Sequence, residues 1–468
     1  MTTHSGASRL RRTLTRASLT VVVAGALSLV SCKASDILDV TDPDIINPAD
    51  VQSLAGANAV RVGAIGRLNS ATSGGSGSSE GLFLLSGLMA DEWINGDSFI
   101  ARQEVDQRVI TVSNTFLTDV NRMLHRARLA SQQAGQLLRK FNPSGAPSDV
   151  AEMYFIQAYV ENVLGEHFCN GLVFSDITDG AETYGQPLTV AAAFQRALAH
   201  ADSGLQLLTG TTAADVKIRN ALNVTKGRIL NNLNRQAEAG AAVATVPTTF
   251  RYENFHSQTT NDNAIWTYNN TARRYNLSNN EGINGLNFVS AADPRVPSCV
   301  GGDAVCTARG FVLRTRDDLT TPLNEQLIWP TRDASIAIAS GTEARMLEAE
   351  AAYKAGNSAL LIQKLNQART EGAITGLAAN LVDPGSNTAR EDLLFRERAF
   401  WLFGRGYRLG DMRRLVRQYG RPVTAVFPTG AWHKAGNYGT DVNFPVPQAE
   451  QNNPNVPPGN NTCIDRNA

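Results

Sequence analysis

The segment ERAFWLFGRGYRLGDMRR, residues 397–414, is the part of the chain that says most about the fold. Leu393, just before this segment, forms an apolar stripe at helical spacing with Phe400 and Trp401 within it. Gly404 and Gly406 then interrupt the helical pattern, which resumes after them. The segment therefore predicts two helices joined by a glycine turn.

Charged residues in this segment fall where helices would pack. Arg408 and Asp411 lie three apart on the second helix, a spacing at which side chains interact. Glu397 and Arg398 lie close by on the first helix. Partly buried charges persist only when they are paired, so we predict an ion network that fixes the crossing of the two helices. A catalytic carboxylate with an activating arginine is the alternative interpretation.

Helical periodicity extends over most of the chain. The stretches that show it are 49–69, 115–140, 148–164, 190–208, 215–240, 342–355, 357–370 and 390–418. A further stretch, 81–92, is helical or mixed. Pairs of helices of this length, joined by short turns and rich in alanine, are typical of TPR-like hairpins, although no clear 34-residue repeat is present. The predicted fold class is mainly α.

Two regions depart from the helical pattern. Residues 241–338 are rich in Asn, Thr, Gly and aromatic residues, and they predict loops and short strands. The tail from 420 to 468 is irregular and rich in Pro and Asn. We therefore expect one domain over residues 32–468, with a helical scaffold at about 49–240 and 342–418 that carries a loop-rich, ligand-binding insertion.

The N-terminus has the features of a bacterial lipoprotein signal. A segment with four arginines and no acidic residue precedes an apolar stretch at 17–30, which is too short for a typical membrane span. It ends in Leu29-Val30-Ser31-Cys32, the pattern of a lipobox. We expect removal of residues 1–31, lipidation of Cys32 and anchoring to a membrane. Lys33 gives no signal for inner-membrane retention. An ordinary cleaved signal peptide is the alternative.

The charge balance argues against a nucleic-acid partner. The whole chain has 43 basic and 43 acidic side chains, and four of the basic ones lie in the expected signal peptide. The remaining chain is slightly acidic and has no basic footprint for a phosphate backbone. No second apolar run approaches the length of a membrane span.

The other four cysteines are Cys169, Cys299, Cys306 and Cys463. An even number in an exported protein favours disulfides. Cys299 and Cys306 flank a Gly-Gly turn, so a local bridge between them is plausible. A Cys169–Cys463 bridge would then tie the tail to the body. Zinc is the competing interpretation, but no pair has Cys-x-x-Cys spacing.

Motifs for catalysis are weak. Glu80, Asp91, Glu92 and Asp97 surround Trp93 and are the best candidates for a pair of hydrolytic carboxylates. There is no nucleophile elbow, phosphate loop, dinucleotide fingerprint or metal-binding histidine spacing. His167 and Cys169 lie two apart, which favours a packed histidine near a disulfide over a catalytic pair. No enzyme activity, cofactor or metal is predicted.

Aromatic residues lie beside amides and charges in two clusters. The first is Trp93, Asn95, Asp97 and Phe99, and the second is Trp266, Tyr268, Asn270, Arg274 and Tyr275, with Trp329 as a separate candidate. Sugars stack their apolar faces on such rings while polar side chains bind the hydroxyls. These residues are the predicted ligand site. Packing of each ring over its own loop is the alternative, although the polar turn around Trp93 favours a displayed ring.

Several segments resemble the SusD/RagB family of nutrient-uptake lipoproteins. Residues 397–414 resemble the family's ER…EL…EGHRWFDLRR segment, and FPVPQAE at 444–450 with Asn453-Pro454 resembles its closing motif. Weaker matches are Leu38-Asp39-Val40 with Pro48, Asp293-Pro294-Arg295, and Arg345 to Ala351. Trp401 and Arg405 replace usual glutamates, and Tyr407 replaces a usual histidine. These departures indicate a divergent branch, so substrate identity cannot be transferred.

The resemblance implies a function and a partner. Such a protein binds a nutrient, a glycan or a peptide fragment, and delivers it to a SusC-like TonB-dependent β-barrel transporter in the outer membrane. The family's aromatic arc on the loop face corresponds in position to the cluster that begins at Trp93. An extracellular glycoside hydrolase and a helical-repeat envelope scaffold are the alternatives.

Overall fold

The computed structural model describes residues 51–75, 79–178, 181–317, 319–456 and 463–468. Residues 52–468 form one compact unit. The expected signal peptide at 1–31 and the expected lipidation site Cys32 lie outside the described residues.

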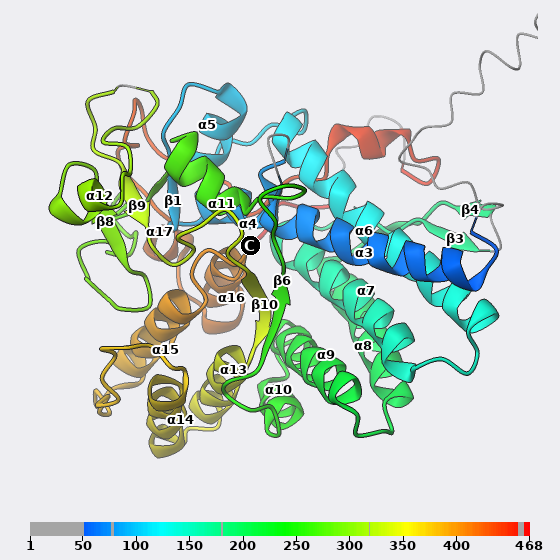
Figure 1. The fold of residues 1–468 in the computed structure, drawn as a ribbon. Coiled ribbons are helices and arrows are strands. Elements are labelled where there is room, and N and C mark those ends of the chain that lie inside the picture. Colours follow the sequence, from blue (N-terminus) through cyan, green and yellow to red (C-terminus); the bar gives the residue numbers. More distant parts are fainter. Residues whose placement is uncertain (1–50, 76–78, 179–180, 318, 457–462) are drawn as a thin grey trace, which may run out of the picture. The chain divides into compact units, whose positions relative to one another are not determined.

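Helices dominate this unit, as predicted (Figure 1). The N-terminal helices are α3 (Leu54–Ser73), α4 (Gly81–Met89), α5 (Ile100–Asp106), α6 (Thr115–Phe141), α7 (Pro147–His167), α8 (Val190–Leu207), α9 (Ala213–Asn232) and α10 (Gln236–Val243). The C-terminal helices are α13 (Gly341–Lys354), α14 (Ser358–Glu371), α15 (Asn387–Trp401), α16 (Arg408–Tyr419), α17 (Val423–Val426) and the 3₁₀ turn η2 (Gln448–Asn452). Between them the helical elements of the described residues are α11 (Ala264–Trp266), the π-helical turn η1 (Thr267–Thr271) and α12 (Ala304–Ala308).

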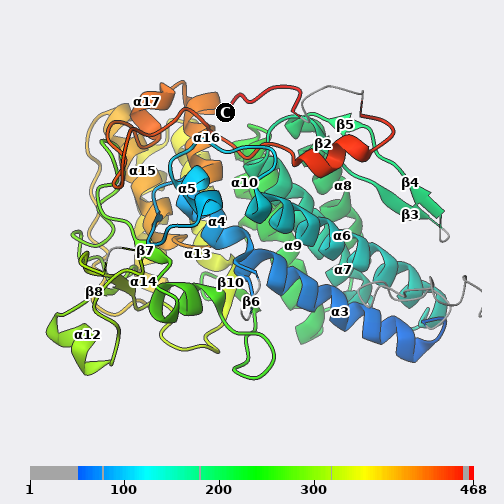
Figure 2. The same cartoon turned by 90° about the horizontal axis from the view of Figure 1, so that it is seen from above.

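The longer helices pack on one another largely in chain order. Helix α3 lies along α6, α7 contacts both α6 and α8, and α9 contacts α8 and α10. Helix α10 then packs on α13, which pairs with α14. Both views of the ribbon show this array of antiparallel neighbours (Figures 1 and 2). Because α7 is covered on several sides, nearly all its side chains after Pro147 are buried, including polar Glu161 and Asn162.

One predicted helix is in fact two. The pattern over 215–240 suggested a continuous helix, but α9 ends at Asn232 and α10 begins at Gln236. Asn234 between them has a φ of 61°, in the left-handed region that a helix cannot continue through. At the other end, Thr212 and Asp215 form a capping box that starts α9.

The strands are short and form five two-stranded antiparallel pairs within the described residues. These pairs are β1 (Trp93–Asn95) with β7 (Tyr275–Leu277), β2 (Leu172–Val173) with β5 (Pro187–Leu188), β3 (Asp176–Thr178) with β4 (Ala181–Thr183), β6 (Arg251–Asn254) with β10 (Ile336–Ser340), and β8 (Ser298–Val300) with β9 (Asn324–Gln326). Most strand residues come from the segment predicted to be rich in loops. Within that segment, α12, β8 and β9 lie at the upper left of Figure 1, whereas β6 and β10 run through the centre.

The ion network predicted around residues 397–414 is present, with one change of partner. Arg398 binds Asp411 through two hydrogen bonds of 2.8 Å, and Arg414 also contacts Asp411. Arg408, however, pairs with Asp91 at the end of α4 rather than with Asp411. Arg413 donates to the carbonyl oxygens of Gly165, Glu166 and Phe168 at the end of α7. Helix α16 is thus tied to three neighbouring elements.

The C-terminal tail is fastened to the end of α7. Phe444 bridges to Phe168, and a disulfide joins Cys169 to Cys463. A second disulfide joins Cys299 to Cys306. Both pairs are those expected from the sequence. Among the described helices, none has the length and apolar character of a membrane span.

Candidate ligand-binding site

Pairing of β1 with β7 joins the two predicted aromatic clusters. Trp93 lies opposite Leu277, and Asn95 lies opposite Tyr275. The Gly96 N–H donates to the carbonyl oxygen of Arg274, 2.7 Å away. Segments about 180 residues apart in the chain therefore form one structural unit, which the sequence alone did not reveal.

The prediction that Trp93 is displayed on a loop is wrong. Its side chain has no exposed surface. The indole lies 5.3 Å from the ring of Phe403, measured between centroids. Gly87 and Gly404 leave room for it, since a Cβ atom at Gly87 would lie 2.5 Å from the indole. Every residue of α4 is buried, so the chain enters β1 from inside the core and the ring stays there.

Five more of the predicted binding residues are buried as well. Asn95, Asp97, Tyr268, Tyr275 and Trp329 are each at most 5% exposed. Their hydrogen bonds show what they do in this conformation. Asn95 exchanges hydrogen bonds with the backbone of Asp97, and the Asp97 carboxylate accepts one from the N–H of Phe99. These polar side chains shape the loop, and a ligand would meet its surface rather than these atoms.

A buried ion cluster supports the loop from beneath. Arg102 of α5 pairs with both Glu80 and Asp97, and the Tyr275 hydroxyl donates to Glu80. Burial, and then the Glu80 carboxylate, raise the pKa of Tyr275 well above its usual value, so the phenol remains a donor. The guanidinium of Arg274 lies 3.7 Å from Asp97. This cluster holds the start of α5 against β7.

Two of the predicted rings reach the surface. Phe99 is 55% exposed, even though the guanidinium groups of Arg102 and Arg274 lie 5.1 and 5.9 Å from its ring centroid. Trp266 is half-buried, and its indole N–H has no hydrogen-bond partner among the described residues. The side chain of Asn270, one turn later, hydrogen-bonds the Glu325 carboxyl group. Trp266 ends α11, directly before the π-helical turn η1, and such turns often occur at functional sites.

The candidate catalytic carboxylates are all engaged in the interior. Glu80 and Asp97 bind Arg102, and Asp91 binds Arg408. Glu92 is buried and accepts a hydrogen bond from the Gly404 N–H, and its burial raises its pKa to about 8. No two of these four groups face each other across an open cleft in the described structure. The hydrolase interpretation gains no support from them.

The remaining chemical candidates have structural explanations. His167 contacts the carbonyl of Val163 at 2.6 Å, and its neighbour Cys169 is in a disulfide. Cys299, Asp303 and Cys306 lie close enough to suggest a metal site. The two cysteines are bonded to each other, however, and Asp303 accepts hydrogen bonds from the N–H groups of Val300 and Cys306. The carboxylate therefore caps helix α12.

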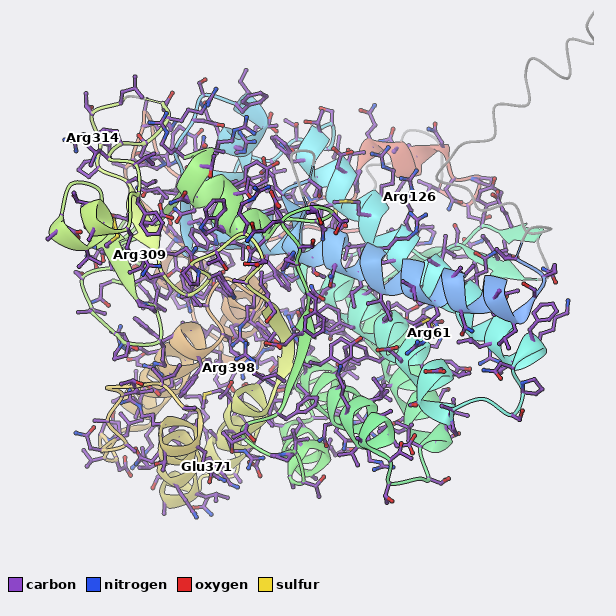
Figure 3. All side chains as sticks on the ribbon, viewed as in Figure 1. Arg61, Arg126, Arg309, Arg314, Glu371 and Arg398 are labelled. Atoms are coloured by element: carbon purple, nitrogen blue, oxygen red, sulfur yellow. A yellow bond between two sulfur atoms is a disulfide. The ribbon has the colours of Figure 1, made fainter. Side chains whose placement is uncertain are left out.

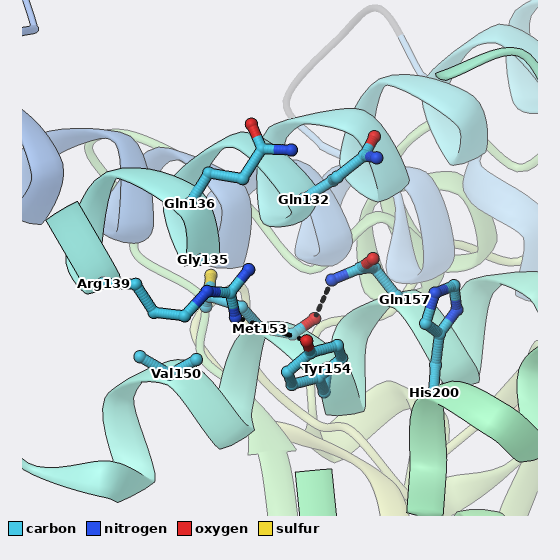
Figure 4. A pocket seen from close by; sticks show the side chains of 9 residues that line it. All are labelled: Gln132, Gly135, Gln136, Arg139, Val150, Met153, Tyr154, Gln157 and His200. Atoms are coloured by element: carbon cyan, nitrogen blue, oxygen red, sulfur yellow. Dashed lines mark hydrogen bonds between the residues drawn. The ribbon is translucent and has the colours of Figure 1, made fainter. Parts of the chain in front are cut away.

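A small cavity of about 150 Å³ lies on the helical scaffold between α6, α7 and α8 (Figure 4). Amide, guanidinium, phenol and imidazole groups line it, from Gln132, Gln136, Arg139, Tyr154, Gln157 and His200. The figure shows the side chains of α6 facing those of α7, with His200 at one end. Tyr154 receives a hydrogen bond from Arg139. None of the residues predicted to bind ligand lines this cavity.

Comparison with solved structures decides the fold. A SusD-like carbohydrate-binding protein from Bacteroides fragilis matches with a TM-score of 0.62 at 13% identity, over 87% of this chain and 99% of that chain. A SusD superfamily protein from Parabacteroides distasonis matches with a TM-score of 0.61 at 15% identity, over 86% and 98%. The chain has the SusD-like fold. Surface glycan-binding protein A from Bacteroides thetaiotaomicron is also similar, with a TM-score of 0.59 at 12% identity over 86% and 97%. No protein-family model and no curated protein sequence matches the chain.

The sequence segments that resemble SusD-like proteins meet inside this fold. Arg295, of the Asp293-Pro294-Arg295 segment, forms two hydrogen bonds to Glu397. Glu350, near the end of the 345–351 segment, pairs with Arg414. The resemblance therefore rests on residues that hold the scaffold together. What the sequence analysis missed is which aromatic rings of the loops are exposed. Nothing in the local pattern separated an exposed ring from a buried one.

Proposed function

We propose that this chain is a surface lipoprotein of the outer membrane that binds a nutrient glycan. The observation that carries the proposal is its SusD-like fold, shared over most of its length with proteins described as carbohydrate-binding. Cys32 would carry the lipid anchor. The same resemblance supports delivery of the glycan to a SusC-like TonB-dependent transporter. Co-purification of the two proteins from outer membranes tests whether this transporter is the partner.

The loop-rich side offers the groups that a glycan needs. Phe99 presents an exposed ring, and a sugar can stack its apolar face on such a surface. Trp266 is half-buried, and its buried indole N–H has no acceptor among the described residues. A buried donor without an acceptor costs about 1–3 kcal/mol, which a ligand hydroxyl would relieve. We therefore place the glycan on Phe99 and on the α11–η1 segment.

Titration of the purified domain (residues 33–468) against a panel of soluble glycans tests this function. We expect saturable binding to at least one glycan without release of product. Phe99→Ala and Trp266→Ala should each weaken binding by roughly 5- to 150-fold, equivalent to about 1–3 kcal/mol.

Tyr184→Ala is the matched control, because Tyr184 is 51% exposed but follows β4, outside the loop-rich segment. It should leave affinity unchanged. Equal loss of affinity in all three variants would contradict the placement of the site. Absence of binding to every glycan would contradict the function, and release of product would favour a hydrolase.

A further inference from the structure

Four arginines of the loop-rich segment differ from most others in the chain. Many arginines of the helical scaffold bind a carboxylate through the guanidinium, as in the Arg398–Asp411 and Arg228–Glu166 pairs. Arg273, Arg309, Arg314 and Arg316 have no carboxylate within ion-pair distance among the described residues. Arg309 and Arg316 are exposed, and Arg273 and Arg314 are half-buried. Figure 3 shows Arg309 and Arg314 on the loop-rich side of the unit.

Backbone contacts hold three of these arginines, Arg273, Arg314 and Arg316, in one region. The Arg273 guanidinium donates to the carbonyl oxygen of Arg314 at 3.4 Å, and the Arg316 N–H donates to the carbonyl oxygen of Arg273 at 3.2 Å. The N–H of Asp317 donates to the carbonyl oxygen of Gly96, which lies in the loop that leads to Phe99. The arginine segment is therefore continuous with the loop that carries the exposed ring of the proposed site.

The acidic groups near these arginines that the structure describes do not neutralise them. Asp317 is paired with Lys434, and Asp97 is paired with Arg102. Glu325 lies close enough to Arg309 for an electrostatic interaction, but burial raises the pKa of Glu325 to about 8. Its carboxyl group is therefore largely protonated at neutral pH. A local positive charge remains, although the chain beyond its expected signal peptide is slightly acidic.

We infer that the loop face binds an anionic glycan, one that carries carboxylate or sulfate groups, through Arg273, Arg309, Arg314 and Arg316. This inference rests on the proposed function and names its substrate class. Guanidinium groups recognise carboxylate and sulfate oxygens through paired N–H donors. Phe99, three residues after Gly96, and Phe311, whose ring centroid lies 5.2 Å from the Arg309 guanidinium, provide apolar surface for sugar rings.

The test uses two pairs of polysaccharides. The two members of each pair have the same sugar chain, but only one of them is charged. Polygalacturonate is compared with its fully methyl-esterified form, which keeps the same chain without carboxylates. Dextran sulfate is compared with dextran, which tests sulfate as the source of charge. We expect the domain to bind at least one of the two charged polymers at least tenfold more tightly than its neutral counterpart. That binding should weaken as NaCl rises from about 50 to 300 mM, because salt screens exposed charges.

Substitution of the arginines locates the interaction. Arg314→Gln combined with Arg316→Gln should weaken binding to the charged polymer by roughly ten- to hundredfold, the range for the loss of charged hydrogen bonds. The control is Arg122→Gln combined with Arg235→Gln, since these arginines are also exposed but lie in i,i+3 pairs with Asp119 and Glu238 on the scaffold. The control should bind as the wild type does.

The outcomes distinguish a failure of this inference from a failure of the proposed function on which it rests. Equal or tighter binding to the neutral polymers would overturn the anionic substrate while leaving glycan binding intact. Equal losses in both double variants would overturn the assignment to these arginines. Binding to vesicles that contain anionic phospholipid, with no binding to any of the four polymers, would overturn both the inference and the proposed function in favour of a membrane surface.

Discussion

Trp93 shows how a single side chain can join several segments. Its indole fills the space between α4 and the turn at Gly404, where a φ of 66° favours glycine. Trp329 approaches the same glycine from the loop-rich segment. Both rings are buried, so they connect the loops to the helical scaffold rather than facing a ligand.

Trp93→Ala is therefore expected to destabilise the domain by about 3–5 kcal/mol, the usual cost of removing a large buried ring. Urea unfolding, followed by the loss of helical circular dichroism, measures this change. Phe99→Ala removes an exposed ring and should change the free energy of unfolding by less than about 1 kcal/mol. An unchanged urea midpoint in Trp93→Ala would show that the ring is not part of the core.

The difference between Trp93 and Phe99 also marks a limit of local sequence patterns. Both lie in the same short polar stretch, which was predicted to be a turn, but Trp93–Asn95 form strand β1 and the chain bends only after them, at Asp97. Whether a ring faces the core depended on β7, which pairs with β1 although it lies about 180 residues later in the chain. The arginines at 309–316 were not singled out for a similar reason, since the sequence does not show that the neighbouring Asp317 pairs with the remote Lys434 instead.

Helix α16 is the element on which the scaffold converges. Four of its side chains are tied to other elements: Arg408 to α4, Asp411 to α15, Arg413 to α7 and Arg414 to α13. Although burial alone would raise the pKa of Asp411, Arg398 and Arg414 overcome this effect and lower it to about 2. Each charge of this buried network thus depends on its partners.

Asp411→Ala should cost about 3–5 kcal/mol, because it leaves the buried Arg398 and Arg414 with one carboxylate fewer. The contribution of Asp411 to stability is fully present above the ordinary aspartate pKa of 3.8 and is lost as the pH falls toward 2. Urea unfolding at pH 7 and at acid pH measures both effects. Asp392→Ala, which removes a 59% exposed partner of Arg421, should cost at most about 1 kcal/mol. Equal costs for the two variants would contradict a buried network.

Elements were predicted well where the helical pattern was strong. The bounds of α6, α8, α13 and α14 agree with the pattern to within a residue or two, because long amphipathic helices carry their signal in every turn. The break at Asn234 was missed, since a single residue with positive φ leaves no trace in apolar periodicity. The short strands were predicted only as a class, because their partners are remote in sequence.

The molecule as a whole divides its residues between a scaffold and a ligand face. Segments that resemble SusD-like proteins lie in the scaffold, where Arg295 meets Glu397 and Arg414 meets Glu350. The exposed ring of Phe99 and the unpaired arginines lie in loops attached to it. This division explains why the fold was predictable from those segments, whereas most of the predicted binding side chains proved to be buried.

Hydrogen–deuterium exchange of the domain with and without a bound glycan tests this account most directly. We predict that the glycan slows exchange in residues 93–102, 264–277 and 309–317, and leaves α6, α7 and α8 unchanged. The methyl-esterified or unsulfated form of the same polymer, added at equal concentration, serves as the control for charge. Protection confined to the cavity between α6, α7 and α8 would contradict a glycan site on the loop face.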